Sequence, residues 1–548
     1  MTTAKRDRPS KRQLGQFITP ESVAGQMLAD IELTADTRIL EPSLGDGAFI
    51  LPLVRRLVAL HTGSPAERLS KVLADNLHGV ELDHKLHARC LQRVAAEFGN
   101  LPEKHNLVHA DFFHHEFEAS WRWGPDGLDD RLTFDLVVGN PPFGGTFDAS
   151  IEDELDRDYG ERFGHKIKKE TYAFFIVKCV ERLNRDGRLL FICSDSLLTI
   201  PTMKGLRVFL MNEGQVRVRR LPEFSDETTY PMVVLDFRRN GRSEAVIRDG
   251  ERISRATVEM SENKSWGMSE DLRPAFAGPT IGNFMVGTSG MTIGKNKYFV
   301  RKIVNGSILE PYRFEFHEEP ITLEGELARA RLGKLSLRKQ EQIRQQERLG
   351  ETRRCVRVLP REKPLTIRLP HADYKQYNKS NGKIVHSEPD HVVYWRNAGE
   401  AVLTFKKSGN WYLRGVGGQP FFEREGLTWQ LIASRLKTRY LPAGCILDSG
   451  APCGFLLPGV PHDELLLVLA WTLSPLCSRI LKSVINHTMN IQSKDFERLP
   501  YPYWVNPEAK EEAIRRMRDL IDHARNGEPF SFDSPEIITL GKAFDFHT

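Results

Sequence analysis

The chain has 548 residues, 40% of them hydrophobic and 27% charged, which is enough to bury the cores of two or three domains. A formal net charge of +4 is too small to indicate a nucleic-acid partner by itself, and the longest mainly apolar run, 465–473, is too short to cross a bilayer. Because the seven cysteines form no C-x-x-C pair and residues 1–12 are basic and polar, we expect a cytoplasmic protein without a disulfide framework, metal site, membrane segment or signal segment.

Short apolar runs alternate with helical patterns along the first part of the chain. This alternation is typical of βαβ units, in which helices cover a largely parallel sheet. We expect strands at 38–40, 77–80, 107–109, 134–138, 188–194, 217–221 and 232–237, and helices at 22–30, 48–60, 84–98, 171–183 and 204–213. The fold class predicted for this part is a Rossmann-like α/β domain.

The sequence pattern changes near residue 240. The Asn240-Gly241 pair marks a turn, and the chain beyond it has less regular alternation, more proline and glycine, and interleaved aromatic residues. We therefore expect a first domain over 1–240, a mixed α+β region over 241–500, and a closing segment over 501–548 that packs onto the body.

A glycine-rich turn follows the first predicted strand. The segment reads Glu41-Pro-Ser43-Leu-Gly45-Asp-Gly47, and its two glycines let the backbone approach a ligand at the start of the next helix. Because the third glycine of the dinucleotide fingerprint is absent, the turn predicts a nucleotide-like cofactor other than a nicotinamide.

Acidic residues follow the next two predicted strands. Glu81 can accept hydrogen bonds from both hydroxyls of a ribose, and Asp111 can accept one from an adenine amino group. Phe112 or Leu82 can then cover a ring face. Each carboxylate taken alone could instead cap a helix, but three such strand ends in succession favour one shared cofactor pocket.

The fourth predicted strand runs into Asn140-Pro141-Pro142-Phe143. A planar amino group is a poor nucleophile until its hydrogens are drawn into hydrogen bonds. The Asn140 side-chain oxygen and the Pro141 carbonyl are suitable acceptors, the proline rings fix the loop, and Phe143 offers an apolar face for stacking. The motif predicts chemistry on such an amino group, and the alternative is an ordinary Pro-Pro turn after a buried strand.

Together these motifs resemble the TaqI-like, gamma-class DNA adenine-N6 methyltransferases of type II restriction-modification systems. The segments that carry the resemblance are Gln16-Phe-Ile-Thr19-Pro20, the glycine-rich turn, Glu81, Asp111 and Asn140-Pro-Pro-Phe143. The resemblance extends over about 16–237 and is looser beyond, where 287–299 and 436–449 are similar to the DNA-reading region of larger enzymes of this kind.

The resemblance implies S-adenosylmethionine as the cofactor. Thr19 would contact its methionine end and Glu41 its amino-group region. Ser43, Gly45 and Gly47 belong to the turn that would cradle it.

The resemblance also implies methylation of adenine N6 in double-stranded DNA, with the base flipped out of the duplex. Phe224 would clamp the flipped base from the side opposite Phe143, although a lone phenylalanine beside a strand is as often part of a core. We expect a monomer on DNA, and a cognate restriction endonuclease is a possible partner.

Three alternatives stay open. An N-P-P-[FY] loop also occurs in enzymes that methylate a glutamine side chain of translation release factors, but the basic and aromatic content after Phe237 favours a nucleic acid. A DNA-binding specificity protein with a degenerate catalytic domain is disfavoured by the intact Asn140, Asp111 and Glu81. Cytosine-N4 methylation uses the same geometry, and by resemblance an asparagine at position 140 favours adenine.

DNA contacts are expected from the second half, where basic and aromatic side chains are interleaved. Basic residues there could bind phosphates or guanine edges. The candidates include 340–348, Arg353, Arg354, Lys375, Arg435, Lys437 and Arg439, with Tyr374, Tyr377, Tyr394 and Trp395 among the aromatic residues.

Overall fold

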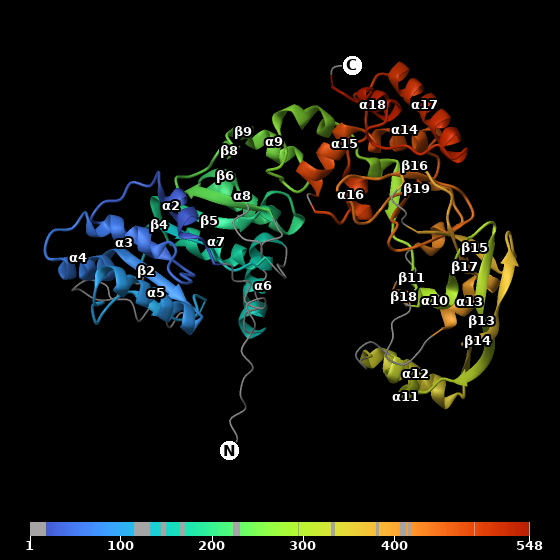
Figure 1. Cartoon of the computed structure of the whole chain (residues 1–548), viewed down its shortest axis with the longest axis horizontal. Helices are drawn as coiled ribbons and strands as arrows, with labels where there is room; N and C mark the ends of the chain where they lie inside the picture. Colours follow the sequence, from blue (N-terminus) through green and yellow to red (C-terminus); the bar gives the residue numbers. More distant parts are fainter. Residues whose placement is uncertain are drawn as a thin grey trace. The chain divides into compact units, whose positions relative to one another are not determined.

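The computed structural model of the chain divides into two compact units, unit 1 (Met1–Arg273) and unit 2 (Pro274–Thr548) (Figure 1). The structure describes residues 18–113, 132–143, 149–164, 170–222, 231–293, 295–329, 335–379, 383–405, 413–414, 418–486 and 488–546.

Within the described residues, unit 1 is built on a nine-stranded sheet with the order β3-β2-β1-β4-β5-β7-β6-β8-β9. The first five strands in that order are parallel, and β7 runs antiparallel to β5 and β6. The strands are β1 (Ile39–Glu41), β2 (Leu77–Glu81), β3 (Leu107–His109), β4 (Phe134–Gly139), β5 (Leu183–Ser194), β6 (Gln215–Leu221), β7 (Met232–Arg238), β8 (Ala245–Arg248) and β9 (Glu251–Ser254).

Helices cover both faces of this sheet, because alternate strand residues point to opposite sides. On β5, Leu190 and Ile192 belong to the apolar cluster that contains residues of α3 and α5. Leu189 and Phe191 belong to the cluster that contains residues of α7 and α8. The helices are α2 (Glu21–Leu28), α3 (Ile50–Val58), α4 (Pro65–Lys71), α5 (His84–Phe98), α6 (Ala149–Phe163), α7 (Tyr172–Glu181), α8 (Lys204–Glu213) and α9 (Arg255–Met260).

Every strand and helix predicted for the first domain is present. The predicted boundary at 240 nevertheless falls inside unit 1, because β8 pairs in parallel with β6 and β9 pairs with β8, which extends the sheet. Three α-helices in the described part of unit 1 were not predicted. One is α4, where Ser64 and Glu67 form a reciprocal capping box. The others are the acidic α6 and the short α9, which lies beyond the predicted boundary.

Unit 2 is a mixed α+β structure, as predicted. It contains a five-stranded sheet (β10-β22-β19-β20-β16), a four-stranded sheet (β12-β17-β15-β21), the small β11-β18 pair and the long β13-β14 hairpin. The strands are β10 (Met285–Thr288), β11 (Thr292–Ile293), β12 (Val300–Lys302), β13 (Ser307–Pro320), β14 (Thr352–Arg368), β15 (Tyr374–Asn378), β16 (Val385–His386), β17 (His391–Tyr394), β18 (Leu413–Arg414), β19 (Gly426–Thr428), β20 (Arg439–Leu441), β21 (Cys445–Leu447) and β22 (Cys453–Leu456).

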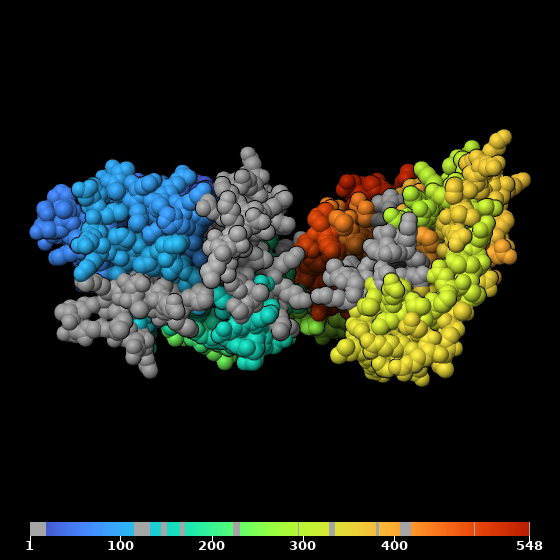
Figure 2. Space-filling view, turned by 90° about the horizontal axis from the view of Figure 1, so that it is seen from below, coloured from blue at the N-terminus to red at the C-terminus, as the bar shows by residue number. Residues whose placement is uncertain are grey.

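The helices of unit 2 lie in two stretches of sequence. Those before residue 405 are α10 (Asn296–Phe299), α11 (Leu323–Arg329), α12 (Leu337–Arg348) and α13 (Arg396–Thr404), and those after 460 are α14 (Asp463–Thr472), α15 (Pro475–Ile480), α16 (Ser493–Arg498), α17 (Pro507–Arg525) and α18 (Pro535–Lys542). The atoms of α11, α12, β13 and β14 form one continuous outer surface of the unit, yellow-green to yellow-orange in Figure 2. Among the described residues no single helix is long and apolar enough to cross a membrane.

Several side chains expected to contact DNA are instead part of the interior of unit 2. Tyr377 is fully buried and Trp395 nearly so, and both belong to the apolar cluster between the sheet and the hairpin, as do Tyr374 and Tyr394. Arg439 is also buried, where it donates to the Asn378 side-chain oxygen at 2.9 Å. The interpretation of these residues as DNA contacts is therefore wrong.

A buried ion pair attaches β13 to the four-stranded sheet. The Arg301 guanidinium of β12 donates to Glu310 of β13, which also accepts a hydrogen bond from the Tyr374 hydroxyl of β15. Arg301 and Glu310 are only 6% and 2% exposed, so neither charge can be compensated by water if its partner is removed.

We predict that Glu310→Ala lowers the free energy of unfolding by about 3–5 kcal/mol, because it leaves the Arg301 charge buried and unpaired. The matched control is Glu315→Ala, which removes an exposed pair with Arg313 on the same strand and should cost at most about 1 kcal/mol. Urea denaturation, followed by tryptophan fluorescence, measures the free energy of unfolding of both variants. An equal loss of stability in the two variants would contradict the role given to Glu310.

Candidate active site

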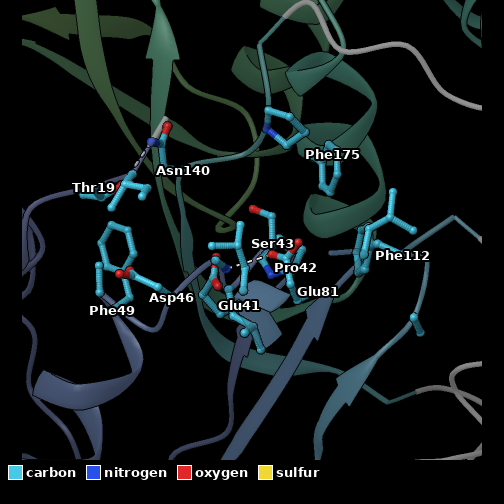
Figure 3. A pocket seen from close by; sticks show the side chains of 18 of the residues that line it. Thr19, Glu41, Pro42, Ser43, Asp46, Phe49, Glu81, Phe112, Asn140 and Phe175 are labelled. Carbon is cyan, nitrogen blue, oxygen red and sulfur yellow. Dashed lines mark hydrogen bonds between the residues drawn. The ribbon is translucent and has the colours of Figure 1, made fainter. Parts of the chain in front are cut away.

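Four strands of unit 1 lead to one pocket (Figure 3). Glu41 and Glu81 are the last residues of β1 and β2, Asn140 directly follows β4, and Asp111 lies two residues after β3. In a parallel sheet these carboxyl ends share one edge, where such folds bind ligands. The pocket is lined by Ile18, Thr19, Glu41, Pro42, Ser43, Leu44, Gly45, Asp46, Ala48, Phe49, Glu81, Leu82, Leu86, Ala110, Asp111, Phe112, Asn140, Pro142, Thr171 and Phe175.

Glu81 holds the glycine-rich turn in place. Its carboxylate accepts hydrogen bonds from the Gly45 and Asp83 amides, both at 2.8 Å. Burial raises the pKa of Glu81, and these amides oppose the rise. Asp83, not Glu81, caps α5 by accepting from the Lys85 amide, so the alternative reading of Glu81 as a helix cap is wrong.

Glu41 is a buried residue of the pocket lining with unsatisfied polar atoms. Neither of its carboxylate oxygens nor the Ser43 hydroxyl has a hydrogen-bond partner within the described ranges. Burial, and to a lesser extent the Glu81 carboxylate, raise the pKa of Glu41 well above its ordinary value, and the nearby amide and hydroxyl of Ser43 only partly oppose the rise. A Cβ at Gly139 would lie 2.5 Å from a Glu41 oxygen, so the glycine before the Asn140 loop makes room for this carboxylate.

Asn140 is oriented by the segment that precedes α2. Its side-chain nitrogen donates to the Thr19 hydroxyl at 3.0 Å, so the amide oxygen lies on the opposite side of the group (Figure 3). Thr19 is itself only 8% exposed. A residue distant in sequence therefore fixes which face of the Asn140 amide can accept a hydrogen bond.

An ion network attaches α2 to the rest of the pocket. Glu21, the first residue of α2, pairs with Arg55 of α3 and with Arg93 of α5. Arg93 also donates to the Asp46 carbonyl at 2.8 Å and lies 3.3 Å from its carboxylate. The Thr19 segment and the glycine-rich turn are therefore attached to the same arginine.

Aromatic side chains form the wall beside Asp111. Phe112 stacks on Phe175 of α7, with ring centroids 5.4 Å apart and an interplanar angle of 5°. The Asp111 carboxylate accepts from the Phe113 amide at 2.9 Å, which fixes the turn after β3. Leu82, which is half exposed, lines the same pocket, so both side chains predicted to cover a ring face are present there.

Thr171 supports the Asn140 loop from α7. It stands at the N-cap of α7 but makes no side-chain capping bond, because its hydroxyl donates to the Pro142 carbonyl at 2.6 Å. The next residue, Tyr172, lies edge-on to the Phe143 ring at 5.7 Å and hydrogen-bonds to Ser196 at 3.0 Å. The first turn of α7 thus contacts two successive residues of the loop.

Most of the predicted site residues are brought together. Thr19, Glu41, Ser43, Gly45, Glu81, Asp111, Phe112, Asn140 and Pro142 all line the pocket. Gly47 supports the turn from behind at φ +91°, where a Cβ would meet the Cys90 sulfur. Pro141 is buried and Phe143 packs into the core beside the pocket, so neither belongs to the lining. Phe224 lies outside the described residues.

Sequence reasoning missed a further set of lining residues. Thr171 and Phe175 are spaced i, i+4 at the start of a predicted helix, so they lie on the same helix face. This spacing could have indicated that one face of the helix lines the pocket. The remaining ones come from the glycine-rich turn and from the segments around it: Ile18, Pro42, Leu44, Asp46, Ala48, Phe49, Leu86 and Ala110.

The strand order and the ligand pocket at the strand ends define a Rossmann-like methyltransferase fold for unit 1, which confirms the predicted fold class. Within it, residues 68–227 match the family described as Eco57I restriction-modification methylase.

Curated relatives agree with this match. The type II methyltransferase M.BstVI of Geobacillus stearothermophilus is 30% identical over 208 residues, which cover 36% of this chain and 36% of that protein. M.TthHB8I of Thermus thermophilus is 29% identical over 267 residues, which cover 47% of this chain and 53% of that protein. The chain therefore spans about a third to a half of these relatives' lengths, and the predicted resemblance to type II methyltransferases is confirmed over that part.

A solved structure extends the likeness in fold to both units. The type IIL restriction-modification enzyme MmeI, solved in complex with DNA, matches 96% of this chain and 71% of its own with a TM-score of 0.50. The sequence identity is 11%, so this likeness concerns the fold alone.

We predict that Glu41→Gln leaves the free protein as stable as the wild type, or more stable, at pH 8. A carboxyl whose pKa is raised on folding lowers stability as the pH rises from its ordinary pKa, near 4.3, to the raised value, because only the unfolded chain ionises freely. The amide is neutral throughout, so the advantage of Glu41→Gln should grow between pH 5 and pH 8. Thermal melts at several pH values measure the difference in stability between the variant and the wild type. If the variant is less stable than the wild type at pH 8, the pKa of Glu41 is not raised.

Proposed function

We propose that the chain is an S-adenosylmethionine-dependent methyltransferase that methylates N6 of adenine in double-stranded DNA, as the modification component of a restriction-modification or phage-defence system. The single observation that carries the proposal is the placement of Asn140 on the wall of the pocket that also contains Glu41, Glu81 and Asp111. Cofactor groups and an activating amide therefore share one cavity.

The residues of the pocket fit S-adenosylmethionine. Its cationic methionine end suits Glu41 and Ser43, whose buried oxygens have no hydrogen-bond partner in the described part of the chain. Glu81 would accept hydrogen bonds from ribose hydroxyls, and Asp111, beside the Phe112 ring, would accept one from an adenine amino group. When bound, the cofactor supplies an electrophilic methyl group on a sulfonium, so the protein needs no nucleophile of its own.

The Asn140 loop would prepare the amine of the target base. The Asn140 oxygen and the Pro141 carbonyl accept its hydrogens, so the nitrogen lone pair is withdrawn from the ring and becomes nucleophilic. Phe143 and Phe224 would hold the flipped base by stacking, which offsets part of the few kcal/mol needed to unpair it. The amine loses its proton after the transfer.

Duplex DNA is the substrate favoured by the relatives. They are named as type II methyltransferases, and the fold of MmeI, solved with DNA, covers almost the whole chain. A second unit of 275 residues suits recognition of a polymer better than of a single side chain. We further propose that the protein acts on DNA as a monomer and that a cognate restriction endonuclease accompanies it.

The proposal predicts that Asn140→Ala lowers kcat for methyl transfer to duplex DNA about 100- to 1000-fold, because the lost acceptor acts mainly in the transition state. Transfer of a tritiated methyl group from S-adenosylmethionine, followed by nucleoside analysis, measures the rate and identifies the base. Calorimetry should give the variant an unchanged cofactor affinity. Label in a peptide or in cytosine would contradict the proposal, and equal loss of transfer and cofactor binding would contradict the role of Asn140.

Thr171→Val should lower kcat about three- to tenfold at unchanged cofactor affinity, because it removes the hydroxyl that donates to the Pro142 carbonyl. Thr171→Ser keeps that hydroxyl and should restore most of the rate. Steady-state kinetics separate kcat from KM for the two variants. If serine and valine reduce kcat equally, Thr171 matters for packing and not for positioning the loop.

A further inference from the structure

Unit 2 holds two large apolar side chains in solvent on adjoining segments. Ile432 is 64% exposed and Met489 is 51% exposed. An antiparallel bridge between Ile432 and Asn490 joins the segments. The Ala433 amide donates to the Met489 carbonyl at 2.8 Å. We define the 432–490 surface by the exposed residues of the two segments, which are Ile432, Ser434, Arg435, Thr488, Met489, Asn490 and Gln492.

The backbone under this surface is fixed by polar side chains. The Lys482 ammonium donates to the carbonyls of Ala433 and Thr488, one on each segment. The Asn486 side chain donates to the Asn490 carbonyl at 2.8 Å and accepts from the Thr488 amide at 2.9 Å. Apolar side chains on so constrained a backbone cannot fold away from water, and this is typical of a surface that is covered by a partner.

Basic side chains outnumber acidic ones next to the surface. Stretches 426–447 and 465–494 contain no Asp or Glu and carry six Lys and Arg residues. Of these, Arg439 is buried, as is Asp495 directly after the second stretch. Arg435 is exposed, with its guanidinium 5.3 Å from the Phe532 ring. Lys494 is also exposed and pairs with Glu497. A basic rim favours a polyanion over an acidic or neutral protein partner.

We propose that the 432–490 surface is a contact of unit 2 with duplex DNA. Ile432 and Met489 touch bases in a groove, where thymine methyl groups and opened base steps accept apolar side chains, while Arg435 binds a phosphate. Asn490 and Gln492 add polar groups able to bond to base edges. The proposal rests on the proposed function, since it names which part of unit 2 meets the substrate.

The test measures the Kd of the full chain for a short DNA duplex at several salt concentrations. The duplex carries the sequence that the protein methylates. Replacing both apolar residues (Ile432→Ser with Met489→Ser) should raise Kd about tenfold at an unchanged salt slope, because base contacts release no counterions. Arg435→Gln should instead reduce the slope of log K against log salt by about one. The control is Ile538→Ser on α18, an apolar residue of 43% exposure, which should leave Kd unchanged.

The outcomes separate this inference from the proposed function. A wild type that neither binds nor methylates DNA overturns the function. A wild type that does both, with the double variant unchanged in Kd, overturns the 432–490 surface alone. The double variant could instead lose self-association in light scattering while its DNA affinity is unchanged. This result would assign the surface to contact with a second copy of the chain and would also overturn the proposed DNA contact. Unchanged cofactor affinity and thermal melts show that the double variant is folded, so a tenfold loss then supports the contact.

Discussion

The pocket of unit 1 depends on burying two carboxylates close together at the ends of neighbouring strands. Glu41 and Glu81 end neighbouring parallel strands, and burial raises the pKa of both. Glu81 is stabilised by two amides of the surrounding turns. Glu41 has no hydrogen bond of good geometry within the described residues, and the nearby amide and hydroxyl of Ser43 only partly oppose the rise in its pKa. Such an arrangement lowers stability in the free protein and becomes favourable when a cationic ligand enters.

The other parts of the site follow from this constraint. Gly139 gives Glu41 its space, so the Asn140 loop leaves β4 directly against the acidic pocket. The segment before α2 then closes over the loop through the bond between Thr19 and Asn140, while Glu21 attaches that segment to Arg93. The proposed cofactor contacts and the orientation of the Asn140 amide thus depend on one connected set of contacts.

The sequence predicted the sheet and the pocket of unit 1 well, because both depend on local patterns. Glycines, acidic residues and the Asn140 loop stand directly after apolar strands, and the topology brings strand ends together. Thr171 was missed because a threonine before a helix is an ordinary cap, and only the fold shows its hydroxyl bonded to Pro142. The boundary at 240 was misplaced because β8 and β9 are short and join the sheet by pairing.

Unit 2 was harder to predict for a physical reason. Aromatic residues interleaved with basic ones fit a stacking surface or a core equally well, and burial of Tyr377 and Arg439 decides for the core. Exposure of Ile432 and Met489 has no local signature either, since isolated apolar residues are common on surfaces.

Calorimetric titration with S-adenosylmethionine in two buffers of different ionisation enthalpy tests the central claim most directly, because it counts protons released on binding. At a pH below the raised pKa of Glu41, the carboxyl gives up its proton to meet the cationic ligand, so the account predicts proton release in the wild type and less in Glu41→Gln. Binding without proton exchange, or with the same release in both proteins, would contradict it.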